Sequence, residues 1–311
     1  WLDLRFLNID DLYSQFDIEL VQNLITNDEW NKFNVYLNMN IPFKGKSNLN
    51  LKQVNINVWS IKEQTSLNKI FKEDKNALMI FFDYNKPIFY KWDYYLFISS
   101  LKNVYYQNFT KHSEKFKFLY ILWNSIKKAT KIICLDENTK DELIERFNVK
   151  ETKLNVISWF FPWLLKLEKT RDTEINLLTI NNIVNPYFIY SCWNWIEKNL
   201  NRLVKAFSII NKWDTNYDLV FLWDEISKDI NLRNLVIKYN LQKSVFFVST
   251  WTLSERKFFY ENALWVIFPS LYEPFPFSLN ETIFFQVPII SSNINSLKKV
   301  LWNKANYFSP I

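Results

Sequence analysis

Short apolar runs alternate with segments of helical periodicity along most of the chain. In the first half, the runs with the length and composition of strands are 2–8, 31–39, 76–84, 93–100 and 131–136. Segments 11–25 and 115–129, which lie between such runs, carry apolar residues at helical spacing. Strands that alternate with helices predict a parallel sheet covered by helices, which is an α/β architecture.

The second half repeats the alternation more regularly. Its strand-like runs and helical segments are, in order, 186–192, 199–212, 217–223, 227–240, 244–249, 253–262, 264–270 and 287–292. Thr252 and Glu255 have the spacing of a capping box, whose hydroxyl and carboxylate satisfy free amides at the start of a helix. Residues 160–185 break the pattern, because they have mixed charge and no clean period.

This organisation predicts two facing Rossmann-like domains with parallel sheets. We expect them at 1–160 and 186–311, joined by a connection at 161–185. Because the chain begins with Trp1 rather than Met, we expect it to be a fragment, with its last domain shortened at the C-terminus. Ligands of such sheets bind at the carboxyl ends of the strands, which here correspond to the turns at 191–198, 223–227, 249–253 and 270–281.

The composition is unusual in one respect, since the chain has 14 tryptophans and a single glycine, Gly45. At the usual frequency of about 7%, a chain of this length would hold roughly 22 glycines. Glycine supplies the positive φ angles of tight turns and helix ends, where a side chain is sterically disfavoured. Tryptophans stand instead in strand-end turns, as in SCWNWIEKN at 191–199.

Charge, apolar run length and cysteine content exclude few kinds of partner or site. The net charge of +6 admits nucleic acid, an anionic membrane surface or a phosphorylated substrate as partner. No basic run interleaved with aromatics has the pattern of a nucleic-acid site, so we expect no nucleic-acid partner. No stretch reaches the roughly 18 to 20 apolar residues of a membrane span. Cys134 and Cys192 form no CxxC pair, so we expect core residues in a reducing cytosol rather than a redox or zinc site.

One segment carries a family resemblance. The stretch FPSLYEPFPFSLNETIFFQVPIISSN, residues 268–293, holds Glu273 and Glu281 eight positions apart between two strand-like runs. It resembles the signature of the group 1 (family 4) glycosyltransferases. The likeness continues upstream through 191–199 and 249–255 and downstream through 301–310. It implies the GT-B fold, a nucleotide-sugar donor and transfer with retention of the anomeric configuration.

The resemblance also implies roles for individual residues. Lys198, in the first turn of a helix after a strand-end loop, matches the lysine of the family's phosphate clamp, where helix amides also favour an anion. Glu273 is expected to accept hydrogen bonds from donor-sugar hydroxyls, and Glu281 to bind the nucleotide ribose. Further donor contacts are expected from Trp193, Asn194, Phe275, Phe277, Ser278 and Leu279. From the residues alone, two alternatives stay open: Lys198 as a solvated charge, and the glutamates as an exposed helix start.

Several features depart from the family pattern. Asn194 stands where the arginine partner of the phosphate clamp is expected. Ser99, Ser100 and Leu101 replace a His-Asp-Leu-like triplet, and residues 9–11 replace a glycine-rich loop. The only histidine, His112, lies in a loop-like stretch and is expected on the surface. No D-x-D triplet and no cluster with metal-ligand spacing occurs in the chain, so we expect neither a metal nor another cofactor.

The expected function is that of a retaining, metal-independent glycosyltransferase. It moves a hexose from a nucleoside diphosphate sugar to a glycan or lipid-linked acceptor. Two alternatives remain: a non-catalytic GT-B binding or scaffold protein, which the missing histidine favours, and a GT-B sugar-nucleotide epimerase, which should lack the glutamate pair. We expect a bacterial, cytoplasmic protein, with peripheral contact to the inner membrane face as a further option.

The tryptophans at 193, 223, 251 and 302 stand where the family usually has glycine. UGA is read as tryptophan in some bacterial genetic codes and as glycine in others. We therefore hypothesise that the gene uses UGA for glycine and that the tryptophans in the sequence as written stand for glycines. The alternative is a surface whose tryptophans stack on sugars. The hypothesis predicts indoles that crowd strand-end turns rather than fill the cores.

Overall fold

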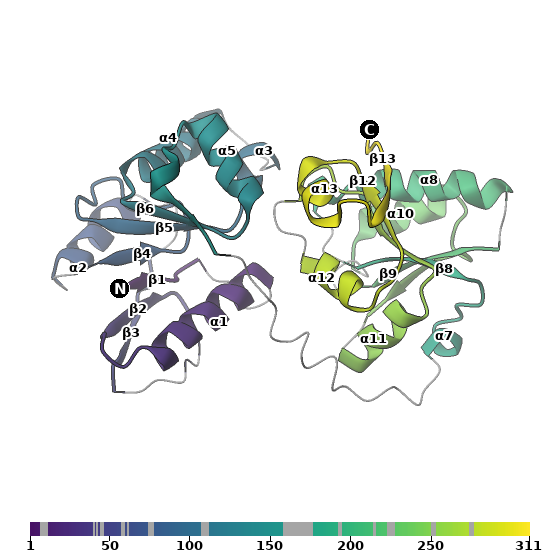
Figure 1. Ribbon diagram of the computed structural model, residues 1–311, viewed down its shortest axis with the longest axis horizontal. Helices are drawn as coiled ribbons and strands as arrows, with labels where there is room; N and C mark the ends of the chain where they lie inside the picture. Colours follow the sequence, from purple (N-terminus) through teal and green to yellow (C-terminus); the bar gives the residue numbers. More distant parts are fainter. Residues whose placement is uncertain are drawn as a thin grey trace. The chain divides into compact units, whose positions relative to one another are not determined.

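The structure is a computed structural model that describes most of the chain. The described residues are 1–6, 12–39, 41, 43, 47–56, 60, 62–73, 78–106, 112–157, 177–191, 195–213, 216–222, 228–249, 253–273 and 277–311. The chain divides into two compact units, Trp1–Ser158 and Trp159–Ile311 (Figure 1). Each unit is built on one parallel sheet, so the predicted α/β class with two Rossmann-like domains is confirmed.

The first unit contains a seven-stranded sheet in the order β3-β2-β1-β4-β5-β6-β7. Its strands are β1 (Leu2–Asp3), β2 (Phe33–Leu37), β3 (Leu49–Gln53), β4 (Met79–Phe81), β5 (Tyr94–Ile98), β6 (Lys131–Cys134) and β7 (Leu154–Val156). All neighbouring strands run parallel. The strand order reverses between β1 and β4, so the carboxyl ends of these strands border the topological switch point of the sheet.

Helices cover both faces of this sheet (Figure 1). They are α1 (Leu12–Asn27), the π-helical turn η1 (Glu63–Leu67), α2 (Asn68–Glu73), α3 (Lys102–Tyr106), α4 (His112–Lys128), α5 (Glu137–Phe147) and the short 3-10 turn η2 (Glu151–Lys153). The core is rich in aromatic rings that meet edge to face, with centroids 4.9 to 5.9 Å apart: Tyr36, Phe71, Phe81, Tyr90 and Tyr94. Such packing fixes the relative positions of the central strands and α2.

The second unit contains a six-stranded sheet in the order β10-β9-β8-β11-β12-β13. Its strands are β8 (Tyr187–Tyr190), β9 (Asp218–Leu222), β10 (Val245–Val248), β11 (Trp265–Phe268), β12 (Ile289–Ser292) and β13 (Ala305–Phe308). All neighbouring pairs are parallel. Here the order reverses between β8 and β11, which brings the segments after these two strands to one edge of the sheet.

Two sets of helices cover this second sheet (Figure 1). The helices and short turns of the unit are α7 (Leu177–Ile180), the 3-10 turn η3 (Ile196–Lys198), α8 (Leu200–Trp213), α10 (Ile230–Lys238), α11 (Leu253–Glu261), α12 (Phe277–Phe284) and α13 (Asn295–Leu301). Buried residues of α11, α12 and α13 pack with Val266 and Phe268 on one face. Residues of α8 and α10 pack with Tyr190 and Phe221 on the other. Neighbouring strand residues thus alternate between two cores, as the strand period requires.

Helix ends show how the chain turns with so little glycine. The described residues with positive φ include Asn148, Asn182, Asn199 and Asn240, with φ between 52° and 61°. Asparagine tolerates this left-handed region better than most side chains. Trp302, which ends α13, has φ 47° and ψ −113°, a combination that a bulky side chain strongly disfavours and glycine accepts. The backbone at 302 therefore favours glycine.

Some expectations from the sequence are corrected here. The pattern does not predict the elements β3, β7, β13, α5 and α13.

The sequence predicts a loop at His112, but His112 is the first residue of α4, and its side chain is exposed. Glu114 in the first turn of α4 complements the helix dipole at this end. Cys134 is buried in the core, as predicted. Residues 9–11, 161–176, Cys192 and Thr252 lie outside the described residues.

Candidate functional site

A buried ion pair lies at the carboxyl edge of the second sheet. Lys198 ends the turn η3 that follows β8, and Glu273 lies in the segment that follows β11. Because β8 and β11 are neighbours in the sheet, these segments meet. Lys198 Nζ lies 2.6 Å from both Oε1 and Oε2 of Glu273. The two side chains are only 4% and 5% exposed, so the pair is almost fully withdrawn from water.

Two serine side chains contribute to the position of the Glu273 carboxylate, one by a direct hydrogen bond and one through the backbone. Ser270 Oγ donates a hydrogen bond of 2.9 Å to Glu273 Oε2, and Ser292 Oγ, at the end of β12, donates one of 2.7 Å to the Ser270 carbonyl. The Leu271 amide donates to the Glu197 carbonyl, so the segment after β11 is also tied to η3. Glu273 is therefore held by the Lys198 ammonium and by Ser270, whose own carbonyl is fixed by Ser292. Charge-assisted hydrogen bonds of this kind are stronger than neutral ones.

Glu281 forms a second, partly buried ion pair with a residue of the preceding helix. It lies on α12, is 2% exposed, and its Oε1 accepts a hydrogen bond from Arg256 Nη2 of α11. Its Oε2 is buried without a hydrogen-bond partner among the described residues. The Tyr260 hydroxyl lies close to Glu281 and Ser191, yet it completes a hydrogen bond with neither. Burial, and then the Glu281 charge, raises the pKa of Tyr260 well above its usual value, so this hydroxyl keeps its proton.

The structure thus places most of the predicted site residues, with one correction. Lys198, Glu273 and Glu281 are all buried, so the alternatives of a solvated lysine and an exposed pair of glutamates do not hold. Lys198 is not in the first turn of a helix, because Asn199 adopts the left-handed conformation and α8 begins after it. Phe277 begins α12, and the next two residues, Ser278 and Leu279, are buried in that helix. Trp193, Asn194 and Phe275 lie outside the described residues.

Two contributors were missed from the sequence, Arg256 and Ser270. Ser270 belongs to the FPS run that carries the resemblance, which is the signal that could have identified it. The sequence around Arg256 indicates only that it lies on a helix. Its partner Glu281 is 25 residues away in the chain, so no local pattern identifies the pair.

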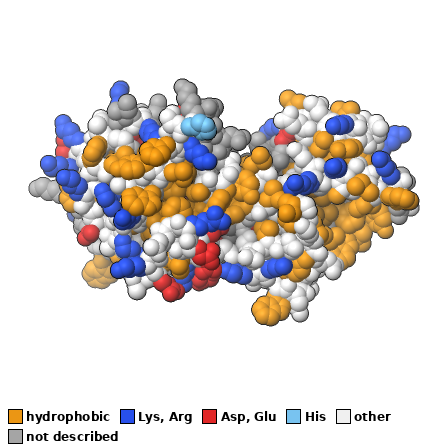
Figure 2. Space-filling view, turned by 90° about the horizontal axis from the view of Figure 1, so that it is seen from above, with side chains coloured by type: hydrophobic (Ala, Val, Ile, Leu, Met, Phe, Trp, Pro, Cys, Tyr) orange, Lys and Arg blue, Asp and Glu red, His pale blue; other side chains and the backbone are white. Residues whose placement is uncertain are grey.

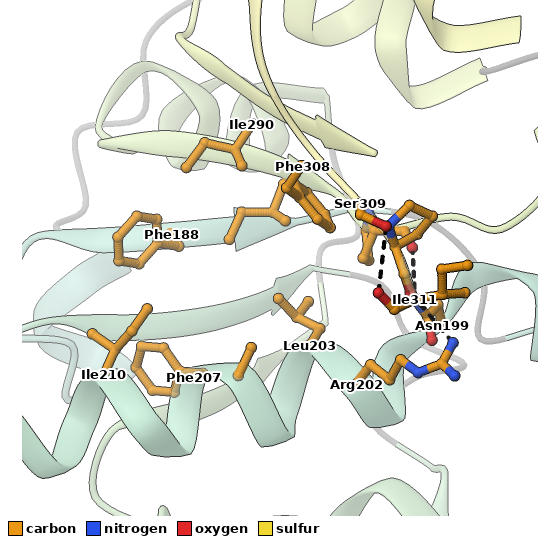
Figure 3. A pocket seen from close by; sticks show the side chains of 14 residues that line it. Phe188, Asn199, Arg202, Leu203, Phe207, Ile210, Ile290, Phe308, Ser309 and Ile311 are labelled. Atoms are coloured by element: carbon orange, nitrogen blue, oxygen red, sulfur yellow. Dashed lines mark hydrogen bonds between the residues drawn. The ribbon is translucent and has the colours of Figure 1, made fainter. Parts of the chain in front are cut away.

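An apolar pocket of about 360 Å³ lies between α8 and the sheet (Figure 3). Phe188, Ile290 and Phe308 line it from the sheet, and Phe207 and Ile210 line it from α8. Its polar side chains include Asn199 and Arg202, which already donate hydrogen bonds to the carbonyls of residues 269 and 310. Most of the remaining lining is apolar, so this pocket does not match the several cations and free donors that a diphosphate needs.

The switch point of the first sheet carries another buried charge cluster, which the sequence did not reveal. Arg5 donates to Asp3 at 2.8 Å and to Glu63 at 3.0 Å, and all three side chains are fully buried. Asp83 follows β4 at this point. Burial, with the nearby charges of Asp3 and Glu63, raises the pKa of Asp83 to about 7, although a hydrogen bond from the Tyr84 amide opposes the shift.

The positions that lack the expected histidine follow β5. Ser100 Oγ accepts a hydrogen bond of 3.0 Å from the Lys102 amide, and Leu101 is fully buried. These residues serve as the entry into α3 rather than as a proton-transfer group.

Two searches were negative within the described residues. No group of three or more His, Cys, Asp and Glu side chains there is arranged to hold a metal ion. None of the helices in the described ranges is long and apolar enough to cross a membrane.

Comparison with known proteins finds a family match within the second unit. Residues 186–308 match the family described as Glycosyl transferases group 1. Among curated proteins, the chain is 24% identical over 197 residues to the O-antigen chain mannosyltransferase RfbU of Salmonella typhimurium, which covers 63% of this chain and 52% of that protein. The chain spans about half the length of the curated relatives that it matches.

Solved structures match nearly the whole chain. WaaG, a glycosyltransferase involved in lipopolysaccharide biosynthesis, matches with TM-score 0.72 and 13% identity, over 99% of this chain and 85% of that chain. Anabaena Alr3699/HepE in complex with UDP and glucose matches with TM-score 0.69 and 11% identity, over the same shares. The fold is therefore that of the GT-B glycosyltransferases. The family match itself is confined to residues 186–308 of the second unit.

Proposed function

We propose that this chain is a group 1 glycosyltransferase that moves a hexose, with retention and without a metal, from a nucleoside diphosphate sugar to a glycan or lipid-linked acceptor. The observation that carries the proposal is the buried Lys198–Glu273 pair, at the carboxyl edge of β8 and β11, inside the stretch that matches the family. The finer assignment to family 4 rests on the spacing of Glu273 and Glu281.

Lys198 is suited to meet the charge that develops on the leaving diphosphate. Donor cleavage breaks the anomeric bond and leaves negative charge on the phosphate oxygens, so preorganised cations and amides accelerate it. Glu273 and the turn η3 hold the ammonium in place before any donor arrives. It therefore needs little reorganisation when the charge appears. In this proposal Glu273 also accepts hydrogen bonds from hydroxyls of the transferred sugar.

Glu281 and the start of α12 are suited to bind the rest of the donor. Arg256 occupies one oxygen of Glu281, and the other is left to accept a hydrogen bond from a ribose hydroxyl. The helix begins at Phe277, so the amides of Phe277, Ser278 and Leu279 lie in its first turn, where N–H groups have no partner within the helix and attract an anion. We assign Trp193, Asn194 and Phe275 to the same donor site on the resemblance alone.

The acceptor hydroxyl loses its proton to an oxygen of the donor phosphate in this proposal. No histidine stands at Ser99 or Ser100 to do so, and the hydroxyls of serines are poor bases. Retention follows when the acceptor attacks from the face that the diphosphate leaves. The HepE complex with UDP and glucose and the mannosyltransferase RfbU make UDP-hexoses and a nucleoside diphosphate mannose the donors to test first.

The proposal is tested by incubating the purified chain with UDP- and GDP-hexoses and a chelator, with and without glycan acceptors. Release of nucleoside diphosphate that increases with acceptor, and a product with the anomeric configuration of the donor, are expected. Donor binding without any release would favour the alternative of a non-catalytic binding protein, which the missing histidine supports. Formation of an epimer of the donor would favour the epimerase.

We also propose that the biological chain carries glycine at most tryptophan positions. Two observations support this. The Trp302 backbone lies in a region that favours glycine. Each tryptophan in the described part of the chain is exposed or half-buried, with Trp30, Trp213 and Trp302 at 95%, 87% and 78% exposure, and of these tryptophans Trp1 packs against the core of the first unit. Trp195 gives no such support for glycine, because its φ of −101° and ψ of 156° suit any residue. The alternative is that such indoles stack on sugars.

We place the protein in the cytoplasm of a bacterium, where nucleotide sugars are made. A lipid-linked acceptor would require contact with the inner face of the membrane.

A further inference from the structure

Three buried polar atoms at one place in the second unit have no hydrogen-bond partner among the described residues. They are Oγ of Ser191, which follows β8, the hydroxyl of Tyr260 on α11, and Oε2 of Glu281 on α12. The exposed fractions of these residues are 2%, 0% and 2%. Buried polar groups in folded proteins are almost always hydrogen-bonded, so orphaned atoms that lie together indicate a missing partner. We refer to the three residues as the polar trio.

The Tyr260 hydroxyl is the centre of the polar trio, because it lies close to both Ser191 and Glu281. Burial is the main cause that raises the pKa of Tyr260 well above its usual value, and the charge of Glu281 adds to the shift. The hydroxyl therefore keeps its proton and has a hydrogen bond to donate. A carboxylate oxygen such as Glu281 Oε2 only accepts, and the Ser191 hydroxyl can donate to the Tyr260 oxygen in turn.

Packing alone does not require a hydroxyl at residue 260. The Tyr260 ring stacks on Phe285 with centroids 5.4 Å apart and belongs to the apolar core on this face of the sheet. A phenylalanine would fill the same space without leaving a polar atom unpaired. Tyr187 lies in the same core and differs, because its hydroxyl donates to the Phe259 carbonyl at 2.7 Å. The Tyr187 hydroxyl thus has a structural use that the Tyr260 hydroxyl does not show.

The polar trio belongs to the edge of the sheet where the donor is proposed to bind. Ser191 directly follows β8, and Glu281 is the proposed ribose ligand, whose Oε1 is already taken by Arg256. On the face of the second unit that Figure 2 shows, lysine and arginine side chains extend into solvent. The Glu281 carboxylate differs from such surface charges, because it is buried and its Oε2 has no partner. A donor hydroxyl that reaches Oε2 would supply the missing contact.

We propose that Tyr260 is a positioning residue of the donor site, which donates to Glu281 Oε2 when a ribose hydroxyl binds there and is itself oriented by Ser191. This inference rests on the proposed function, in which Glu281 binds the ribose. A carboxylate oxygen can accept more than one hydrogen bond, so Oε2 serves Tyr260 and the ribose together. With Arg256 at one oxygen and Tyr260 at the other, the carboxylate loses little freedom when the ribose arrives, which favours binding.

The consequence is selectivity for the sugar of the nucleotide. A site whose buried polar groups stay unpaired when a ligand hydroxyl is missing discriminates against the ligand that lacks it. The polar trio therefore predicts that the chain prefers ribonucleoside diphosphates to their 2′-deoxy or 3′-deoxy forms. Tyr260 should enlarge this preference, because it holds the oxygen that meets the hydroxyl.

Calorimetric titration with UDP, GDP and their 2′-deoxy and 3′-deoxy forms measures the preference. For a nucleotide that the parent binds, loss of at least one ribose hydroxyl should weaken binding by about tenfold, because the contact is with a charged group. Tyr260→Phe should bind the ribonucleotide about threefold to tenfold less tightly, and the same missing hydroxyl should then weaken binding by only about threefold. Ser191→Ala should act in the same direction with a smaller effect, and it tests the relay without a change in the apolar core.

Tyr187→Phe is the matched control, since it removes the hydroxyl of another tyrosine in the same core. It should unfold at a lower denaturant concentration than the parent, because the Phe259 carbonyl loses its donor. Its ratio of affinities for the ribonucleotide and the deoxy form should equal that of the parent. Tyr260→Phe should show the opposite pattern, with stability equal to or above that of the parent and a reduced ratio.

The outcomes separate this inference from the proposed function. A reduced ratio in Tyr260→Phe without loss of stability supports the inference, because a tyrosine with a purely structural role would change stability and leave the ratio as it is. Equal ratios in the parent and in both Tyr260→Phe and Ser191→Ala, with all three proteins binding the nucleotide, overturn the inference and leave the proposed function standing. No binding of any of these nucleotides by the parent overturns both.

Discussion

The ammonium of Lys198 lies 2.6 Å from both carboxylate oxygens of Glu273, although 75 residues separate the two in the chain. The neighbouring positions of β8 and β11 in the sheet make this contact possible. Both charges are buried, so each stabilises the other against the cost of leaving water. The same pair that ties η3 to the segment after β11 is the one that the proposed reaction uses.

Changing Glu273 should affect turnover more than donor affinity. Glu273→Gln keeps the shape of the side chain but removes its charge, so Lys198 is held less firmly and contacts that strengthen in the transition state are lost. We expect kcat to fall by about tenfold to a hundredfold with a smaller change in donor Kd. Steady-state kinetics and calorimetric titration measure the two quantities. Lys257→Met, which removes a half-buried ammonium that lies 3.9 Å from Glu261 on α11, is the control and should change neither.

Removing Lys198 should also destabilise the second unit. Lys198→Met leaves Glu273 as a buried charge without its ion-pair partner, which costs about 3–5 kcal/mol of unfolding free energy. The double change Lys198→Met with Glu273→Gln should recover part of this loss, because no charge then remains unpaired. Denaturant unfolding gives the values. Equal stability of the single variant and the parent would mean that the pair is solvated in solution.

Glu281→Ala should weaken donor binding by about tenfold or more, because a hydrogen bond to a charged group contributes roughly 1.5–3 kcal/mol. Ribose contact is the same in the ground state and the transition state, so KM should rise with little change in kcat. Arg256→Gln should act in the same direction and more weakly, since Arg256 holds Glu281 in place. Unchanged KM in both variants would remove the ribose assignment.

The stability of the first unit should decrease as pH rises from about 4 to 7. The pKa of Asp83 is raised to about 7 in the folded chain, whereas an unfolded aspartate titrates near a pKa of about 3.9. The folded state therefore holds a proton in this range that the unfolded state has lost, so deprotonation favours unfolding. Asp83→Asn should make this part of the pH dependence flatter. A free energy of unfolding with the same slope in both proteins would contradict this role of Asp83.

Trp302→Gly should stabilise the protein despite the loss of an aromatic side chain. The indole is 78% exposed, so little burial is lost, whereas relief of the positive φ should gain roughly 1–2 kcal/mol. Trp123→Gly is the control, because residue 123 lies inside α4, where glycine costs roughly 0.5–1 kcal/mol of stability.

Sequencing the gene tests the hypothesis that the tryptophans stand for glycines. UGA at the tryptophan positions, with a transfer RNA that reads UGA as glycine, is expected, whereas UGG at those codons would contradict it.

The sequence predicts the alternation of strands and helices because buried parallel strands need continuous apolar runs. It misses β3, which lies at the edge of its sheet and carries Asn50, Lys52 and Gln53 in place of such a run. It also misses β7, which is three residues long. Local patterns of this length do not distinguish a short edge strand from a loop.

The candidate site is predictable in its residues but not in its contacts. Glu273, Glu281 and Lys198 are recognisable from their surroundings in the chain. Their pairing is not, since Lys198 meets Glu273 only because the strand order reverses between β8 and β11, and Arg256 meets Glu281 only through the packing of α11 on α12. The charge cluster around Arg5 depends likewise on the adjacency of β1 and β4. Contacts between distant segments follow from topology, which a local pattern does not contain.

Calorimetric titration of UDP- and GDP-hexoses into the parent and the Lys198→Met variant, with chelator present, tests the central claim most directly. We predict that the parent binds at least one nucleotide hexose without any divalent metal, and that Lys198→Met weakens this binding by about tenfold or more, while Lys257→Met leaves it unchanged. Binding by the parent that appears only after manganese is added, or equal affinity of the parent and Lys198→Met, would contradict a donor site built on the Lys198–Glu273 pair.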